Sequence, residues 1–213
     1  MSRFELVIFD CDGVLIDSES VAMPVLRAML MELGATLELD ELHEQFGGRS
    51  LDQVLARAGE VLGEQPPPTF IDDFAVRCGE VFRTELVPID GVAELLNSLA
   101  HPFCTASNAD SVELRSNLEV AGLLHHFGER MFSADDVERP KPAPDLYLLA
   151  ARTLGFEPAL CAVVEDTPTG VAAGAAAGMQ VFGYASRHPA ERLMEAGASE
   201  TFTAMSELPR LLR

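Results

Sequence analysis

Basic residues are scarce in this chain of 213 residues. Lysine and arginine together number 15, against 34 aspartates and glutamates, and the formal net charge is −19. A chain this acidic repels nucleic-acid backbones and anionic membrane surfaces, so we expect neither as a partner. It also repels phosphorylated metabolites. Any phosphate chemistry therefore requires local positive charge, from a metal ion, a basic pocket or both.

Lysine itself is almost absent. Fourteen of the basic residues are arginines, and Lys141 is the single lysine. A lone lysine in an arginine-rich background suggests that this position needs a compact ammonium, which a planar guanidinium does not replace.

Long apolar runs and paired cysteines are also missing. No stretch of the sequence approaches the ~20 apolar residues that cross a bilayer, and we identify no signal peptide. The four cysteines form no CxxC pair, and two of them lie in predicted strands. We therefore expect reduced, mostly buried thiols in a cytoplasmic protein.

Short apolar runs alternate with helical patterns along most of the chain. The spacing predicts strands at residues 4–9, 103–106, 130–133, 160–164, 181–184 and 201–202. Helices are predicted at residues 92–99, 110–121, 144–154, 171–177 and 190–195. Such alternation predicts an α/β fold with a Rossmann-like parallel sheet that helices cover on both faces.

An early block departs from this alternation. It contains no convincing strand, and its patterns predict helices at residues 17–33, 39–46, 50–62 and 70–85. We interpret this block as a helical cap inserted into the α/β core. The predicted domains are a catalytic core of residues 1–16 and 88–213 and a cap of residues 17–87.

Polar residues gather where the predicted strands end, which is where open α/β sheets bind their ligands. The side chains concerned are Asp10, Asp12, Ser107, Asn108, Lys141, Glu165 and Asp166. Clustered carboxylates repel one another and are costly to bury, and a divalent cation resolves both problems. Ligands that are all oxygens suit Mg²⁺, which we expect as the cofactor.

Four motifs resemble those of the haloacid-dehalogenase-like superfamily, in the same order. They are Asp10-Cys-Asp12-Gly-Val-Leu, Thr105-Ala-Ser107-Asn108, Arg139-Pro-Lys141-Pro-Ala-Pro-Asp145 and Val164-Glu165-Asp166-Thr-Pro-Thr-Gly170. The resemblance covers essentially the whole chain, and the helical block matches the cap of β-phosphoglucomutase-like members. It implies a phosphatase, similar to bacterial sugar-phosphate phosphatases, that acts on a sugar phosphate or a 6-phosphogluconate-like compound.

The resemblance also implies catalytic roles. Asp10 is expected to be the nucleophile that forms an aspartyl-phosphate, and Asp12 the general acid and base. Ser107 and the backbone beside Asn108 are expected to bind the phosphoryl oxygens of the substrate. Lys141 is expected to neutralise the charge that develops on them.

The metal ligands implied by the resemblance come from the same motifs. Asp166 is expected to bind Mg²⁺ together with the Asp10 side chain and the Asp12 backbone carbonyl. Glu165 is expected either to bind the ion as well or to lie directly behind its ligands.

A turn between two cap helices lies where relatives carry a substrate-specificity loop. Gly48 and Arg49 in this turn are expected to contact the substrate, Arg49 through a second phosphate or a carboxylate. An ordinary arginine in a helix-connecting turn is the alternative.

Two other functions stay open. Sugar-phosphate mutases of the β-phosphoglucomutase type share these motifs, but they usually carry a cap histidine where this chain has Ala22. A receiver-like signalling module would also be phosphorylated on Asp10 with Mg²⁺ and a lysine, but receivers are shorter and have no helical cap. We expect a monomer whose partner is a small phosphate ester.

Overall fold

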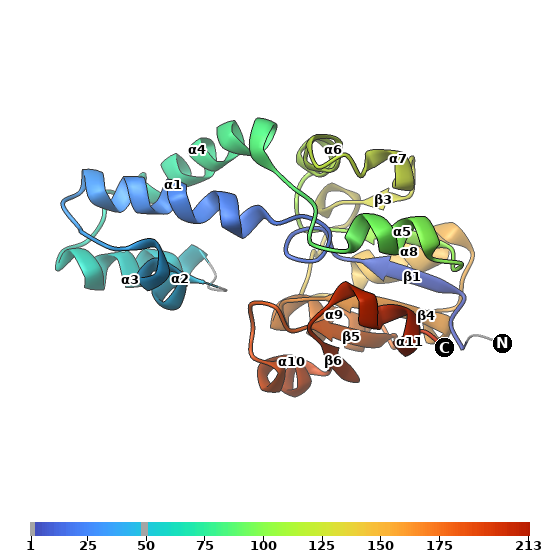
Figure 1. Cartoon of the computed structure of the whole chain (residues 1–213). Coiled ribbons are helices and arrows are strands. Elements are labelled where there is room, and N and C mark those ends of the chain that lie inside the picture. Colours follow the sequence, from blue (N-terminus) through green and yellow to red (C-terminus); the bar gives the residue numbers. More distant parts are fainter. Residues whose placement is uncertain (1–2, 48–50) are drawn as a thin grey trace. The chain divides into compact units, whose positions relative to one another are not determined.

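The short apolar runs of the sequence form a six-stranded parallel sheet in the computed structural model, which describes residues 3–47 and 51–213 except the side chain of residue 40 (Figure 1). The strands are β1 (Leu6–Phe9), β2 (Phe103–Ala106), β3 (Met131–Phe132), β4 (Cys161–Glu165), β5 (Gln180–Tyr184) and β6 (Glu200–Phe202). Strands β1, β2 and β4 are buried at every position, as expected for strands covered on both faces.

The strand order is β3-β2-β1-β4-β5-β6, with every neighbouring pair parallel. The chain first builds the sheet outward from β1 to β3 and then crosses back to add β4 on the other side of β1. This order is that of a Rossmann-like fold, and it confirms the predicted fold class. The direction of winding reverses between β1 and β4, where Phe9 pairs with Val164.

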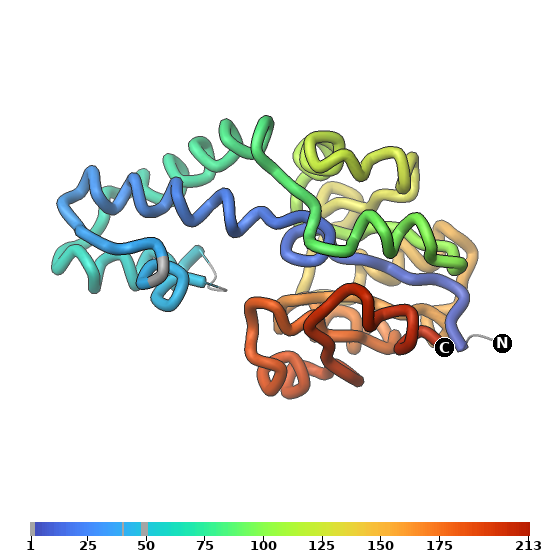
Figure 2. Tube along the Cα trace, viewed as in Figure 1, coloured from blue at the N-terminus to red at the C-terminus, as the bar shows by residue number. Residues whose placement is uncertain are grey.

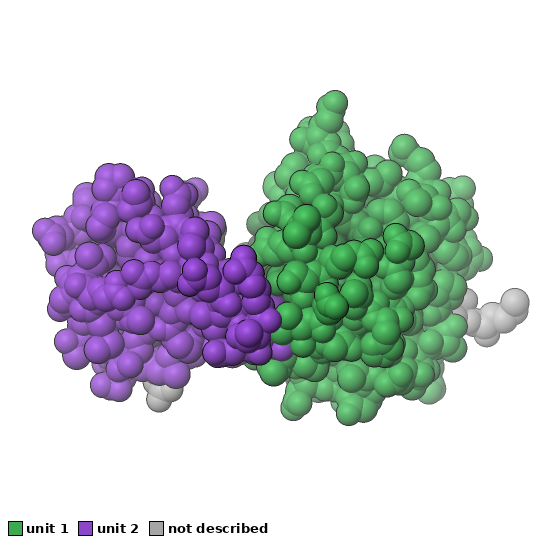
Figure 3. Space-filling view, turned by 90° about the horizontal axis from the view of Figure 1, so that it is seen from above, with its two compact units in different colours: residues 1–17, 87–213 green, residues 18–86 purple. Residues whose placement is uncertain are grey.

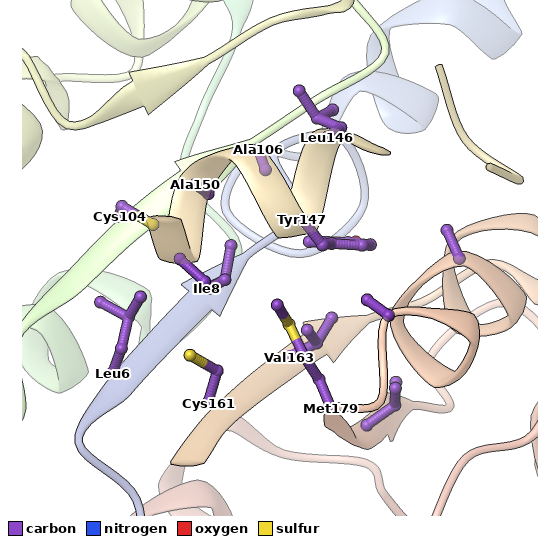
Figure 4. Packing of buried hydrophobic residues seen from close by; sticks show 14 of the residues in the cluster. Leu6, Ile8, Cys104, Ala106, Leu146, Tyr147, Ala150, Cys161, Val163 and Met179 are labelled. Atoms are coloured by element: carbon purple, nitrogen blue, oxygen red, sulfur yellow. The ribbon is translucent and has the colours of Figure 1, made fainter. Parts of the chain in front are cut away.

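Helices α8 (Asp145–Leu154), α9 (Pro168–Ala176) and α10 (Ala190–Ala196) cover one face of the sheet. Figure 4 shows Leu6 and Ile8 of β1 in this layer, with Cys104, Cys161 and Val163 from the neighbouring strands. Alternate residues of a strand point to opposite faces, so Phe9 lies on the other side. There its ring packs edge-on against Phe103 at a centroid distance of 6.2 Å.

Shorter helices complete the α/β part of the chain. They are the α-helices α5 (Val92–Ser98), α6 (Ser111–Val120), α7 (Leu124–Phe127) and α11 (Leu208–Leu211) and the 3₁₀-helices η1 (Ala134–Asp136), η2 (Pro158–Leu160) and η3 (Met205–Glu207). The ring of Phe127 in α7 packs edge-on against that of Phe103 at a centroid distance of 5.5 Å. This contact covers the second face of the sheet over β2. All four cysteines of the chain are buried free thiols.

The chain divides into two compact units, Met1–Asp17 with Val87–Arg213, and Ser18–Leu86 (Figure 3). The second unit consists of α1 (Ser18–Glu32), α2 (Leu39–Phe46), α3 (Leu51–Leu62) and α4 (Phe70–Glu85). It has its own apolar core, whose most buried members include Leu26, Leu42, Phe46, Ala58 and Phe70. None of the described helices is both long and apolar enough to cross a membrane.

Two adjacent segments carry the chain out of the α/β unit and back into it, and the trace in Figure 2 can be followed through both. Ile16 forms an antiparallel bridge with Pro88. The Asp17 N–H donates to the Val87 carbonyl, and the Ile89 N–H donates to the Leu15 carbonyl, both at 2.9 Å. The two linkers are therefore tied to each other by backbone hydrogen bonds.

Gly174 allows α9 to lie close to the sheet. A Cβ at this position would come within 2.7 Å of Val181 Cγ2 and 3.3 Å of Val163 Cγ1. We expect Gly174→Ala to lower the free energy of unfolding by about 1–3 kcal/mol, because the added methyl overpacks the layer. Urea unfolding followed by circular dichroism measures this change.

Gly79 in α4 provides the matched control. A Cβ there would meet nothing within 4 Å. Gly79→Ala should therefore stabilise its helix by about 0.5–1 kcal/mol, because alanine loses less backbone entropy than glycine on folding. Similar stabilisation by both substitutions would contradict the close packing of α9.

Candidate active site

The reversal point of the sheet brings three carboxylates together. Asp10 directly follows β1, and its N–H donates to the Val164 carbonyl of β4 at 2.9 Å. Glu165 ends β4, and Asp166 follows it. All three side chains are buried, and one carboxylate oxygen from each lies within 4.8 Å of the other two. Strand pairing alone therefore assembles the acidic cluster.

The single lysine lies within this cluster. Lys141 Nζ donates to Asp10 Oδ1 at 2.6 Å and to Glu165 Oε1 at 2.8 Å. Its side chain is only 4% exposed. A buried ammonium is tolerated only with such partners, so Lys141 and the two carboxylates depend on one another.

The charges in the cluster perturb one another. Burial, followed by the negative charge of Glu165, raises the pKa of Asp10 to about 7, although Lys141 acts in the opposite direction. Burial and the charges of Glu165 and Asp10 raise the pKa of Asp166 well above its usual range. Burial alone would lower the pKa of Lys141, but Asp10 and Glu165 raise it well above the usual lysine value. The lysine therefore stays charged, while protonation of Asp10 and Asp166 is favoured.

The donor set of the cluster fits a divalent cation. Among the described residues, Asp166 Oδ1 is buried and finds no hydrogen-bond donor. A buried carboxylate oxygen without a partner is costly, and a metal ion would satisfy it. Gly13 makes room for this carboxylate, since a Cβ there would lie 2.0 Å from Asp166 Oδ2. Its φ of +79° also favours glycine.

Four hydrogen bonds hold the Glu165 carboxylate. Its Oε1 accepts from Lys141 and from the Tyr147 hydroxyl at 2.9 Å, and its Oε2 accepts from both the backbone N–H and the hydroxyl of Thr167 at 3.0 Å. Glu165 is therefore part of the acidic cluster and at the same time fixes Lys141 in place.

Tyr147 was not predicted as a site residue. It lies in α8, is fully buried, and its ring centroid is 4.8 Å from Lys141 Nζ, a cation–π distance. Burial, and then the charge of Glu165, raises the pKa of its hydroxyl well above the usual range. The hydroxyl therefore stays protonated and donates to Glu165. In the sequence, Tyr147 occupies an apolar position of a predicted helix, and nothing there signals this role.

The end of β2 carries the two other predicted side chains. Ser107 is buried, and its hydroxyl oxygen accepts from the Ala109 N–H at 3.1 Å. The Asn108 amide does something the sequence does not predict: its two ends bond to the backbone N–H and carbonyl of Lys141, each at 3.0 Å. The structure thus joins the second and third motifs through one side chain.

Asp12 lies in a tight loop that follows Asp10. The Cys11 carbonyl accepts from the N–H groups of Leu15 and Ile16, and the Gly13 N–H donates to the Ile16 carbonyl at 2.9 Å. Asp12 is half-buried, and its charge is among those that raise the pKa of Asp10 after burial and Glu165. The loop therefore keeps a second, more accessible carboxylate beside the first.

Gly48 and Arg49, the predicted specificity residues, lie outside the described residues. The described chain stops before them at Gly47, directly after α2. A Cβ on Gly47 would lie 2.6 Å from the His43 carbonyl and 3.0 Å from Glu19 Oε1, so this position has no room for a side chain.

Arg187 is a second cation near the cluster that the sequence did not reveal. It follows β5 and forms an ion pair with Asp17 at the first linker. Its charge opposes the rise in the pKa of Asp166 that burial and Glu165 cause. One arginine among fourteen carries no signal in the sequence, and only the fold brings it to this edge of the sheet.

Comparison with known proteins places these features in a family context. The model of the haloacid dehalogenase-like hydrolases matches residues 4–178. The chain is 32% identical over 212 residues to 6-phosphogluconate phosphatase of Escherichia coli (strain K12), and the match covers 99% of this chain and 96% of that protein.

Solved structures show the same fold. A haloacid dehalogenase family hydrolase from Deinococcus radiodurans R1, solved with bound phosphate and sodium, is 37% identical with a TM-score of 0.86, covering 100% of this chain and 96% of that chain. A putative β-phosphoglucomutase from Thermotoga maritima is 29% identical with a TM-score of 0.76, and 98% of each chain is covered.

The raised pKa of Asp10 predicts that the stability of the metal-free protein depends on pH. Between the usual value of 3.8 and about 7, the folded chain retains a proton that the unfolded chain has lost. Rising pH therefore favours unfolding across this interval. In the presence of a chelator, we expect the stability of the wild type relative to Asp10→Asn to fall as the pH rises from about 4 to about 7.

Thermal unfolding of both proteins across this range measures the effect. A divalent cation should restore more stability at the upper end of the range than at the lower end, because it binds the ionised carboxylates. A stability difference that rises with pH would contradict the proposed repulsion within the cluster.

Proposed function

The chain belongs to the haloacid dehalogenase-like hydrolase family, and we propose that it is a Mg²⁺-dependent phosphatase that hydrolyses a small phosphorylated metabolite through a phosphoryl group carried on Asp10. The contact between Lys141 Nζ and Asp10 Oδ1, within a buried group of three carboxylates, carries this proposal. Phosphoryl transfer needs a positioned nucleophile and local positive charge more than it needs covalent chemistry from the protein. This contact supplies both in a chain whose net charge is −19.

In the first half of the proposed reaction, an Asp10 oxygen attacks the phosphorus atom and the bond from phosphorus to the leaving oxygen breaks. Asp12 gives its proton to that leaving oxygen, and the alcohol departs. In the second half, a water molecule attacks the phosphoryl group on Asp10 and gives a proton to Asp12. Inorganic phosphate leaves, and both carboxyl groups return to their starting states.

The remaining residues would bind and orient the phosphoryl group. Lys141 would neutralise charge on its oxygens while still held by Glu165. Ser107, buried at the end of β2, would donate a hydrogen bond to it. Both act in a site where low solvent access strengthens electrostatic interactions.

Mg²⁺ would be held by the Asp10 side chain, the Asp12 carbonyl and Asp166, with Glu165 beside them. The unpartnered Oδ1 of Asp166 supports this assignment. When bound, the ion would offset the repulsion between the acidic cluster and the phosphate and stabilise charge on the transferring group.

The substrate class rests on the relatives. Those matched include a 6-phosphogluconate phosphatase and a fructose-1-phosphate phosphatase of E. coli, which favours a phosphorylated sugar or sugar acid. We propose that Gly48 and Arg49 select the substrate through its second anionic group. A mutase reaction is the alternative, and Ala22, in place of the usual mutase histidine, favours hydrolysis. The buried free thiols agree with a cytoplasmic location.

Phosphate release from a panel of metabolites, with and without Mg²⁺, tests the proposal. The panel contains 6-phosphogluconate, hexose 6-phosphates, fructose 1-phosphate, β-glucose 1-phosphate, nucleotides and pyrophosphate. Metal-dependent release from one or a few compounds is the expected result, and a chelator should abolish it. Conversion of β-glucose 1-phosphate to glucose 6-phosphate without phosphate release would instead identify a mutase.

Asp10→Asn and Asp12→Ala separate the two carboxylate roles. Asp10→Asn should lower phosphate release by about 10³-fold or more, because it removes the nucleophile. Asp12→Ala should slow turnover by about 10²–10⁴-fold and accumulate phosphoenzyme with p-nitrophenyl phosphate, whose leaving group needs no proton. Mass spectrometry of the quenched protein detects the phosphoryl group. Near-native turnover of Asp10→Asn would disprove the nucleophile assignment.

A further inference from the structure

One side chain ties the loop that carries Lys141 to the end of β2. Asn108 Nδ2 donates to the Lys141 carbonyl, and the Lys141 N–H donates to Asn108 Oδ1, each at 3.0 Å. An amide offers a donor and an acceptor at once, so it can pair with both backbone groups of one residue. Asn108 and Lys141 are 33 positions apart, so this link depends on the tertiary fold.

Few backbone hydrogen bonds can tie this loop to its surroundings. Three of the five residues from 140 to 144 are proline and have no backbone N–H to donate. Ala143 donates to the Pro140 carbonyl within the loop. The Arg139–Asp145 ion pair joins the two ends of the loop through three hydrogen bonds of 3.0–3.2 Å, but it does not tie the loop to β2. The two hydrogen bonds to Asn108 therefore hold the Lys141 backbone in place relative to the end of β2.

The other end of Lys141 is held separately by Asp10 and Glu165. A lysine side chain has several rotatable bonds, so contacts at its ammonium alone do not determine the direction from which it enters the site. With the backbone held by Asn108 and the ammonium held by two carboxylates, one direction is selected. Small displacements of groups that position a reacting centre can cost about 10²-fold in rate.

We propose that Asn108 is a positioning residue that acts through Lys141, and that its side chain is not a ligand of the phosphoryl group. This inference rests on the proposed function, in which Lys141 neutralises the transferring phosphoryl group. Because Ser107 directly precedes Asn108, the same β2 loop would set the positions of a phosphate-binding hydroxyl and of the lysine together. The second and third motifs would then move as one unit.

The single lysine makes a direct test possible. Protein labelled with ¹⁵N only in lysine gives one backbone amide signal, that of Lys141, without further assignment. Losing a hydrogen bond of about 1 kcal/mol should speed amide exchange of Lys141 roughly fivefold in Asn108→Ala. Asn108→Asp should also lose protection, because it keeps the acceptor Oδ1 but sets a second carboxylate oxygen against the Lys141 carbonyl. Asn97→Ala, an exposed asparagine in α5, should change nothing.

Kinetics then test whether the effect on Lys141 matters for catalysis. We expect Asn108→Ala to lower kcat by about 10–100-fold. In a Lys141→Met background, the same substitution should cost little more, because a residue that acts through Lys141 has no separate effect once the lysine is gone. Lys141→Gln serves as a second background if the methionine variant folds poorly, because its amide keeps a donor while removing the ammonium. Asn108 is exposed, so its substitution should leave the fold intact.

The outcomes separate the two hypotheses. An unchanged Lys141 amide in Asn108→Ala, or losses that multiply in the double variant, would overturn the positioning role and indicate direct substrate contact. If the wild type hydrolyses no phosphate ester while the Lys141 amide still responds to Asn108→Ala, the proposed function fails, and the structural link between the two residues stands.

Discussion

The buried contact between one ammonium and two carboxylates governs the rest of this site. Lys141 compensates part of the charge of Asp10 and Glu165, but Asp166 adds a third carboxylate within 4.8 Å. The carboxylates therefore repel one another, and burial first and neighbouring carboxylates second raise the pKa values of Asp10 and Asp166. The same imbalance would favour the binding of a divalent ion at this cluster.

The strand order explains why so little of the chain is needed to build this site. Because winding reverses between β1 and β4, the residues that follow these two neighbouring strands lie at the switch point of the sheet, where open α/β folds bind their ligands. Asp10 and Glu165 occupy the two sides of that reversal, and Lys141 reaches it from the loop before α8. Gly13 and Gly170 leave room for the carboxylates, since a Cβ on Gly13 would collide with Asp166 and a Cβ on Gly170 would collide with Glu165. Backbone geometry, rather than a large number of polar side chains, brings the charges together.

Much of this arrangement could be predicted from the sequence, because strongly buried strands leave a clear apolar signal. The fourth strand, predicted at residues 160–164, is Cys161–Glu165, and the predicted parallel α/β fold is confirmed. The four-residue helices α7 and α11 were missed, because one turn is too short to show helical periodicity.

The sequence also did not predict which residues far apart in the chain contact each other. Tyr147 looks like an ordinary core residue, and Asn108 like a helix-capping or phosphate-binding residue, until the fold places both against Lys141. Motif spacing identifies residues that share an edge of the sheet, but it does not say which of them touch. The choice between Glu165 as a ligand and as a neighbour of the ligands shows the same limit, since its four hydrogen bonds come from three separate positions in the chain.

The scarcity of lysine now has a physical explanation at position 141. Its ammonium lies 2.6 and 2.8 Å from two carboxylate oxygens and 4.8 Å from the Tyr147 ring centroid, in a space that is almost closed to solvent. A compact point charge can meet all three partners there, whereas a guanidinium would have to spread a planar fork of five donors through packed side chains. Elsewhere the chain uses arginine in exposed pairs such as Arg77 with Glu32, where a broad bidentate group fits well. At position 141 the shape of the site therefore favours lysine, because two carboxylate oxygens and a ring converge on one point.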